Sequence, residues 1–531
     1  MAACWPNVQF FLISPRIKWR TDQTAADQDP VPEEQRTWTA WDFATYWMSD
    51  LINVTTWQIA SSAMLVGLST SDAVVIALLS GLLNALPTVL NGAPGADYHI
   101  PFPIAIRSSY GYYFGYFCVV SRSILAIIWF GVNCWFGSVA VTEVSMFRLS
   151  LPYGPSTAPS RINCRGGWGH VSTNDILLFA LCNPDPLLLH SFHPPKAPFP
   201  LESDISCARI CCHGALDLSQ GRGSTGDLQG IFNQQARVSG STRAWLWLAT
   251  FCATTNSWMS CAINMSDFTR MSKSRNAPWS QIPTIPIVRI LYAILGIATV
   301  GAGRTLYDKD IWSPVEMLPL WTGSGGRFLA FCAGCLWILA QISTNLSANG
   351  IPFGHDLMNI WPAYINVRRG SLLCLLFGTW AVVPWKLVST AGQFLTFMNG
   401  YGCVVCAIVS IMIADYWMIR RRILDIPGLY DSRGRYRYIG GVNWRAAITQ
   451  VLFLAISLPG IVWQISPTNS IPLGFQRIYQ LNWFVNTFGP LLLYWALFKL
   501  LPDRESTADM GNYAMDCAST EEERGENGKR S

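Results

Sequence analysis

Long apolar runs recur along most of this 531-residue chain and constrain its fold more than any other feature. A helix needs about 20 apolar residues to cross a bilayer. Only 13% of the residues are charged, which is roughly half the share found in soluble domains. Because backbone polar groups in lipid must be paired within each segment, these runs predict an all-α polytopic membrane protein. Ten candidate spans follow from this pattern, at about 43–68, 73–93, 110–142, 243–265, 283–303, 326–350, 371–389, 393–419, 446–464 and 480–501.

Charge and hydropathy divide the chain into five parts. The loops that follow the even-numbered spans carry basic clusters, such as Arg420, Arg421 and Arg422. Basic residues in short loops favour the cytoplasmic side, so we interpret these clusters as topology anchors and expect both termini in the cytoplasm. The predicted parts are a cytoplasmic N-terminal tail (1–42), transmembrane helices one to three (43–143), an atypical insert (144–242), the remaining transmembrane helices (243–501) and a disordered cytoplasmic tail (502–531).

The insert contains nothing that resembles a membrane span. Its best apolar run, "ILLFALC", is seven residues long, and nine prolines fall between Pro152 and Pro200. The stretch "CARICCHG" (207–214) is rich in Cys and His, but its spacing fits no standard ligand pattern, so no metal site is predicted. Since the flanking topology requires an even number of crossings here, the insert crosses the membrane zero times or twice.

Polar side chains gather within several predicted spans. In "WFGVNCWFG" (129–137), Trp129 and Asn133 are four residues apart and share one helix face. An amide in lipid is costly, so Asn133 should face the helix bundle. Two readings are open, a hydrogen bond between packed helices and part of a ligand site.

Three further stretches favour the ligand site. They are "WMSDLINVTTWQIASS" (47–62), "TTNSWMSCAIN" (254–264) and "AQISTNLSAN" (340–349). The density of polar groups in the first predicts a helix that is interrupted around a site. Indole rings and amides suit a flat, polar heterocycle, and serine and threonine hydroxyls suit a small cation. The candidate side chains in these stretches are Ser49, Asn53, Ser257, Trp258, Ser343, Thr344 and Asn349.

At these residues the chain resembles a known family. It is similar to nucleobase:cation symporter family one, in particular to its fungal uracil/allantoin/uridine/thiamine permease branch. The motifs that carry the resemblance include "NGAPGADYHIPFPIAIRSSYG", "IIWFGVNCWFG", "NMSDFTR", "STNLSANGIPFGHDL" and "IADYWMIRRRILDIPGLY". The resemblance implies a LeuT-like fold of two inverted five-helix repeats with two extra C-terminal helices. Helices four and five of that fold are apparently missing or replaced by the insert.

The resemblance also implies roles for individual residues. Trp129 and Trp258 match two tryptophans that sandwich the substrate ring, and Asn349 matches a substrate-binding asparagine. Asn133 stands where the family usually has glutamine, and Asn53 where a bacterial relative has it. The sodium site of that relative is matched by Ser49, Ile52, Ala340, Ser343 and Thr344, and its extracellular gate by Phe397 and Met398.

The sequence therefore predicts a secondary active transporter of the plasma membrane and not an enzyme, since no constellation of catalytic groups stands out. It would import a planar heterocycle such as uracil, allantoin or uridine by alternating access, coupled to a proton or to sodium. Its expected partners are that substrate, the coupling cation and the lipid bilayer, with no cofactor and no nucleic acid. Two alternatives are open: a thiamine or nicotinamide riboside transporter, and a non-functional product of a frameshift or retained intron in the insert.

Overall fold

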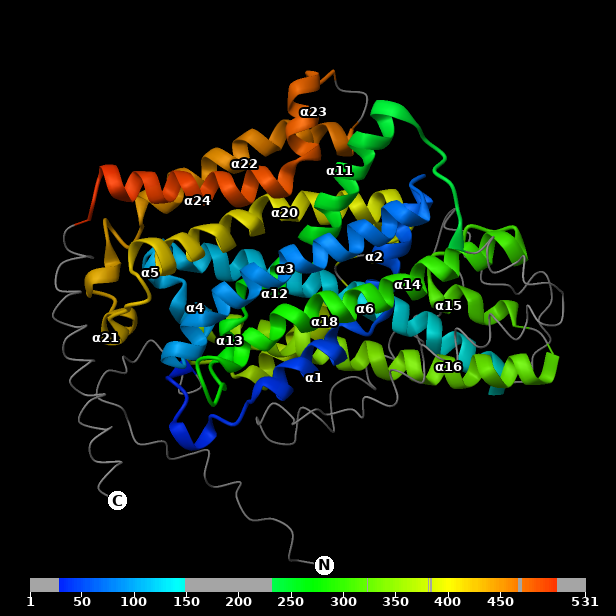
Figure 1. Ribbon diagram of the computed structural model, residues 1–531. Coiled ribbons are helices and arrows are strands. Elements are labelled where there is room, and N and C mark those ends of the chain that lie inside the picture. Colours follow the sequence, from blue (N-terminus) through cyan, green and yellow to red (C-terminus); the bar gives the residue numbers. More distant parts are fainter. Residues whose placement is uncertain are drawn as a thin grey trace, which may run out of the picture.

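Long helices running in one common direction make up the protein (Figure 1). The computed structural model describes residues 28–148, 232–321, 323–380, 382, 384–466 and 470–503. Most of the predicted insert, including 207–214, lies outside these ranges, as do residues 1–27 and the tail from 504 onward. At the edges of the insert, helices extend further than predicted, because α6 continues to Arg148 and α11 already begins at Gly240.

The first predicted span is interrupted, as the sequence predicted. Helix α1 ends at Leu51 and α2 begins after Asn53, whose side chain accepts a hydrogen bond from the Thr56 backbone N–H (2.7 Å) and caps α2. Ser69 caps the next helix in the same way. The helices of this part are α1 (Ala40–Leu51), α2 (Val54–Leu65), α3 (Thr70–Tyr98), α4 (Phe102–Ala105), α5 (Arg107–Tyr110) and α6 (Gly115–Arg148).

Two further spans are irregular at their polar stretches. The fourth span breaks at Ser257 and Trp258, and the sixth changes to a π-helical segment, η6 (Asn345–Gly350). Such π segments are frequent at functional sites. The helices here are α11 (Gly240–Asn256), α12 (Met259–Ile263), α13 (Ser266–Thr269), α14 (Gln281–Tyr307), α15 (Pro314–Met317), α16 (Gly323–Thr344) and α17 (Ile351–Ile360).

The C-terminal part adds two long helices that pack beside α20 (Figure 1). Thr390 caps α20, and Asn443 caps α22. The helices are α18 (Val367–Trp380), α19 (Pro384–Leu387), α20 (Ala391–Ile413), the π-helical η7 (Ala414–Ile419), α21 (Ile426–Tyr430), α22 (Trp444–Ile465), α23 (Leu473–Gln480) and α24 (Asn482–Leu500).

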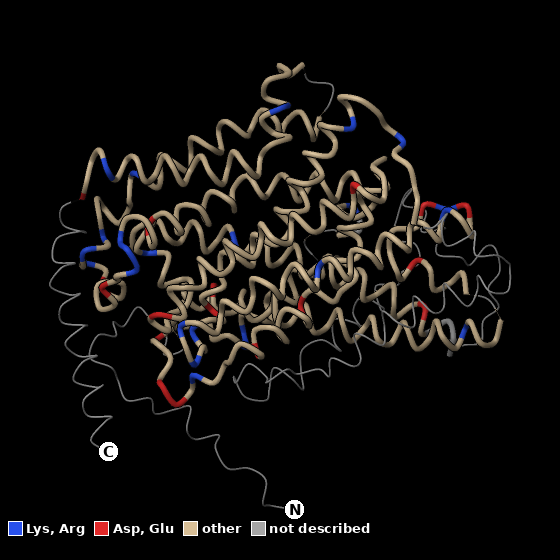
Figure 2. Tube along the Cα trace, in the orientation of Figure 1, with Lys and Arg blue, Asp and Glu red and all other residues tan. Residues whose placement is uncertain are grey.

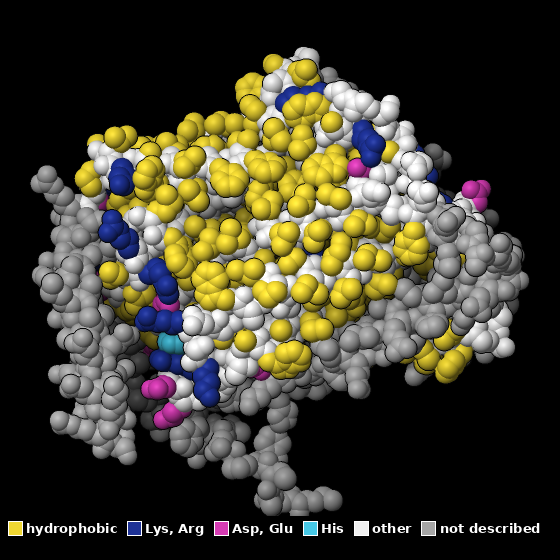
Figure 3. All heavy atoms as spheres, in the orientation of Figure 1, with side chains coloured by type: hydrophobic (Ala, Val, Ile, Leu, Met, Phe, Trp, Pro, Cys, Tyr) yellow, Lys and Arg dark blue, Asp and Glu magenta, His cyan; other side chains and the backbone are white. Residues whose placement is uncertain are grey.

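The surface fits a bilayer. Charged residues gather toward the two ends of the bundle, whereas the middle carries few (Figure 2). Apolar side chains cover the face between these ends (Figure 3). The exposed apolar side chains of α3 and α14 include Leu82, Leu86, Ile287 and Leu291. All ten predicted runs coincide with helical segments, and six helices in the described part are long and apolar enough to cross a membrane without a break.

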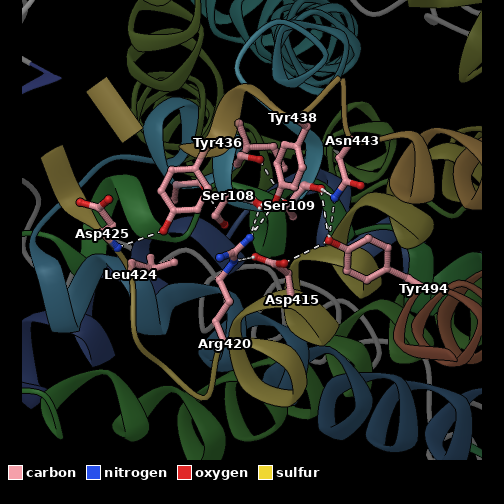
Figure 4. Close-up of polar contacts among 12 residues, drawn as sticks. Ser108, Ser109, Asp415, Arg420, Leu424, Asp425, Tyr436, Tyr438, Asn443 and Tyr494 are labelled. Carbon is pink, nitrogen blue, oxygen red and sulfur yellow. Dashed lines mark hydrogen bonds and ion pairs between the residues drawn. The ribbon is translucent and has the colours of Figure 1, made fainter. Parts of the chain in front are cut away.

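Arg420 also has a structural role that the sequence did not predict. Its guanidinium is fully buried and pairs with Asp415 (Nε to carboxylate oxygen, 2.8 Å). Arg420 also donates to the Ser108 carbonyl, and Tyr494 of α24 donates to the other Asp415 oxygen (Figure 4). The pair therefore joins η7 to α5 and α24, whereas Arg422 remains exposed, as a topology anchor would be. Sequence position alone could not separate the two, because neighbouring residues at a helix end point in different directions.

Candidate functional site

One cavity lies where α6, the α1–α2 break, the α11–α12 break and η6 meet, and its open volume is about 520 Å³. Interrupted helices are typical of binding sites in transporters, because they expose backbone groups that a regular helix would use internally. All six side chains predicted to bind the substrate line this cavity: Trp129, Asn133, Trp258, Asn349, Asn53 and Ser257. The other lining residues are Thr55, Ile59, Arg122, Ala126, Ser260, Cys261, Thr344 and Ala348.

The two indole side chains of the cavity have free polar edges. Trp129 and Trp258 are each 8% exposed, and neither indole N–H has a hydrogen-bond partner among the described residues. Trp47 packs edge-on against Trp258, with ring centroids 6.2 Å apart. Buried indole N–H groups usually find an acceptor, so the Trp258 N–H is available to a ligand in the cavity, whereas the Trp129 indole also lies edge-on against the Tyr401 ring.

The amides of the cavity differ in how far the protein already uses them. Asn133 accepts hydrogen bonds at Oδ1 from Thr55 Oγ1 (2.8 Å) and Gln341 Nε2 (3.4 Å), so it also joins α6 to α2 and α16. Asn349 Nδ2 donates to Asn345 Oδ1 (3.1 Å). Asn133 therefore makes the hydrogen bond between packed helices and also lines the cavity, while ligand binding by its amide stays a prediction.

Asn53 is the most fully engaged of these amides. Its Nδ2 donates to the Asp50 carbonyl (2.6 Å) and to Thr344 Oγ1 (3.4 Å), while its Oδ1 caps α2. Asn53 therefore stabilises the break between α1 and α2 beside the cavity.

The residues predicted to bind a cation lie on the same two segments. Ser49 Oγ and Ser343 Oγ are 2.8 Å apart and connect α1 to α16. Thr344 lines the cavity, and Ile52 and Ala340 are buried at the end of α1 and within α16. Of the residues predicted to bind a cation, Ser49 and Ser343 are the two whose side chains are in direct contact.

The two predicted gate residues have different surroundings. The Phe397 ring is half-buried and contacts the Trp129 ring, with centroids 5.6 Å apart. Met398 is buried in the main hydrophobic core. Of the two, Phe397 lies directly against an indole of the cavity.

Sequence reasoning missed Arg122 and Gln341. Arg122 lines the cavity and forms a buried ion pair with Asp356 of α17, whose carboxylate also accepts from Ser123 Oγ (3.2 Å). A signal existed, because a basic residue within a predicted span is a functional suspect, and Arg122 lies seven residues before Trp129, on the same helix face. Gln341 Oε1 accepts from the Val54 backbone N–H (3.3 Å), so it supports the α1–α2 break.

Broken membrane helices around a central polar cavity are the architecture of a secondary transporter. The chain belongs to the family described as permease for cytosine/purines, uracil, thiamine, allantoin, whose family model matches residues 30–161 and 221–486. It is thus a multi-pass membrane transport protein and not an enzyme, as the sequence predicted. The gap between the two matched ranges, 162–220, falls within the predicted insert.

Similar proteins agree with this family. The allantoin permease of Saccharomyces cerevisiae is 29% identical, covering 90% of this chain and 75% of that protein. Nicotinamide riboside transporter 1 and the uracil permease of the same yeast are each 28% identical, covering 90% of this chain and 79% and 76% of their own lengths.

The solved structure of Mhp1, a nucleobase-cation-symport-1 family transporter with bromovinylhydantoin bound, is 17% identical to this chain. It covers 92% of this chain and 100% of its own, with a TM-score of 0.68. This likeness shows the LeuT-like fold that the sequence predicted.

Proposed function

We propose that this chain imports a planar, uncharged heterocycle such as uracil, allantoin or uridine, together with a proton or sodium, across the plasma membrane. The observation that carries the proposal is the meeting of two indoles and three amides around one cavity. Flat rings stack on indole, and amides pair with the polar edge of a base. The substrates in the names of the relatives above have such edges.

The charge of the cavity favours a neutral substrate over thiamine or nicotinamide riboside. Its lining includes one cationic side chain, Arg122, and no carboxylate among the described residues. A cationic ligand would gain from the indole faces but would find no carboxylate in the lining to pair with, since Arg122 already pairs with Asp356. Thiamine and nicotinamide riboside remain the second candidates, since a transporter of the latter is as similar to this chain as the uracil permease is.

Alternating access then uses the helix breaks. With both termini in the cytoplasm, Phe397 would close the cavity from outside, and the Ser49–Ser343 pair would hold the coupling cation between α1 and α16. No cofactor is required, because the chain moves its substrate without changing it.

Uptake by cells that express the chain tests this proposal. Radiolabelled uracil, allantoin, uridine, thiamine and nicotinamide riboside are compared across external pH and with sodium replaced by choline. We expect Trp129→Ala and Trp258→Ala to lower uptake by about fivefold or more, since loss of base stacking costs about 1–3 kcal/mol per base. Trp361→Ala is the matched control, because Trp361 is 53% exposed and lies outside the cavity lining.

Surface fluorescence of a tagged chain separates the outcomes. Normal uptake by both cavity variants would refute the site. If the unaltered chain reaches the plasma membrane but transports none of the five compounds, the alternative of a non-functional product is supported.

A further inference from the structure

A second, smaller cavity lies behind the first and contains an unpaired cation. Its lining comes from α2, α3, α11 and α14 and includes Thr56, Thr254 and Arg289. These three side chains are 4%, 1% and 4% exposed, so each is more than nine-tenths buried. The cavity has room for about one water-sized particle.

Among the described residues, Arg289 has one hydrogen bond and no acidic ion-pair partner. Its Nη2 donates to the Thr254 carbonyl (3.1 Å), while its Nη1 is buried without a partner. In the part of the chain that the structure describes, no carboxylate forms an ion pair with it. A buried charge without a counter-charge is strongly unfavourable, so the guanidinium needs a compensating anion.

The hydroxyls of the cavity have unused hydrogen-bonding capacity as well. Neither Thr56 Oγ1 nor Thr254 Oγ1 has a partner among the described residues, although both atoms are buried. A hydroxyl can donate to an anion as readily as an N–H can. Three potential donors therefore line a space of atomic size.

We propose that Arg289, Thr56 and Thr254 bind one small monovalent anion of the chloride type. The small volume of the cavity favours a monatomic anion over a larger one. The net positive charge of its lining distinguishes this site from a water site, because a neutral water would leave the guanidinium uncompensated.

The anion would be linked to the substrate cavity through one carbonyl group. The Thr254 carbonyl that accepts from Arg289 also accepts from Ser257 Oγ (2.6 Å), and Ser257 lines the first cavity. Ile59 lines both cavities. The bound anion therefore stabilises the α11–α12 break that forms one wall of the substrate site.

Thermal unfolding of the purified full-length chain tests the site without any substrate. Sodium chloride is titrated against sodium gluconate at constant ionic strength, and unfolding is followed by tryptophan fluorescence. Because a ligand that binds only the folded state stabilises it, we expect the midpoint to rise saturably by a few degrees with chloride and with bromide. Equal midpoints in chloride and gluconate would overturn the proposal.

Variants assign the effect to these residues. Arg289→Met should abolish the chloride dependence without lowering the midpoint in gluconate, because it removes an uncompensated charge. Thr56→Val should weaken the apparent chloride affinity about fivefold, as expected for one lost hydrogen bond. The matched control is Arg304→Met on the same helix, whose loss should leave the chloride dependence intact.

Two results would contradict the assignment. One is an unchanged chloride effect in Arg289→Met. The other applies if Arg289→Met does not fold: the apparent chloride affinity would then be unchanged in both Thr56→Val and Thr254→Val. Since sodium is constant and no substrate is added, neither result depends on the proposed transport function.

Discussion

The Arg122–Asp356 ion pair holds α6 against α17 beside the substrate cavity, and removing either partner should strongly destabilise the fold. The two side chains are 3% and 0% exposed. Leaving one charge buried and unpaired typically costs about 3–5 kcal/mol, whereas replacing both charges with apolar groups of similar size is often neutral. We therefore expect Arg122→Met and Asp356→Leu each to lose about 3–5 kcal/mol of unfolding free energy, and the double variant to lose much less.

Reversible unfolding in mixed detergent micelles measures these free energies, and the four proteins form a double-mutant cycle. Stability is the right readout, because Arg122 also lines the cavity and its loss would alter uptake for a second reason. The matched control is Arg237→Met. Arg237 pairs with Asp310, but the two side chains are 54% and 44% exposed, so the loss should stay below about 1 kcal/mol.

An Asp356→Leu protein as stable as the unaltered chain would refute this reasoning. Equal losses in the single and double variants would also contradict it, since the cost would then come from lost packing and not from an unpaired charge.

Two further predictions concern packing and pH. A Cβ at Gly296 would lie 2.4 Å from the Trp57 carbonyl oxygen. Gly296→Ala should therefore push α14 away from α2, and size-exclusion chromatography should show no peak of folded protein. The control, Gly325→Ala, has open space at its Cβ and should elute normally. Burial raises the pKa of Asp310, but hydrogen bonds and charge from Arg304 outweigh it and hold that pKa below its ordinary 3.8. A carboxyl with a lowered folded-state pKa stabilises above the ordinary value and loses that effect as pH falls through the folded value. Asp310→Asn should therefore slightly lower the melting temperature at about pH 6, and the difference from the unaltered chain should shrink as the pH falls below about 3.8. An equal difference at all pH values would contradict the assignment.

Local sequence chemistry was enough to predict the helices and several polar residues of the cavity. The ten apolar runs predicted helical segments because lipid forces the backbone to pair within each segment. The polar residues of the first span predicted its break, since an asparagine side chain can cap a helix and replace a lost backbone bond. Trp129 and Asn133 fall on one face from their spacing alone.

Only the tertiary structure decided which polar groups have hydrogen-bond or ion-pair partners and which residues those partners are. Asn53 and Asn349 look alike in sequence, yet the first is engaged in the α1–α2 break and the second hydrogen-bonds only within η6. Arg420 and Arg289 are both buried arginines, but Arg420 pairs with Asp415, whereas Arg289 has no acidic partner among the described residues. The partners of a buried charge come from helices distant in sequence, so the helical period places a side chain on a face but cannot reveal what that face meets.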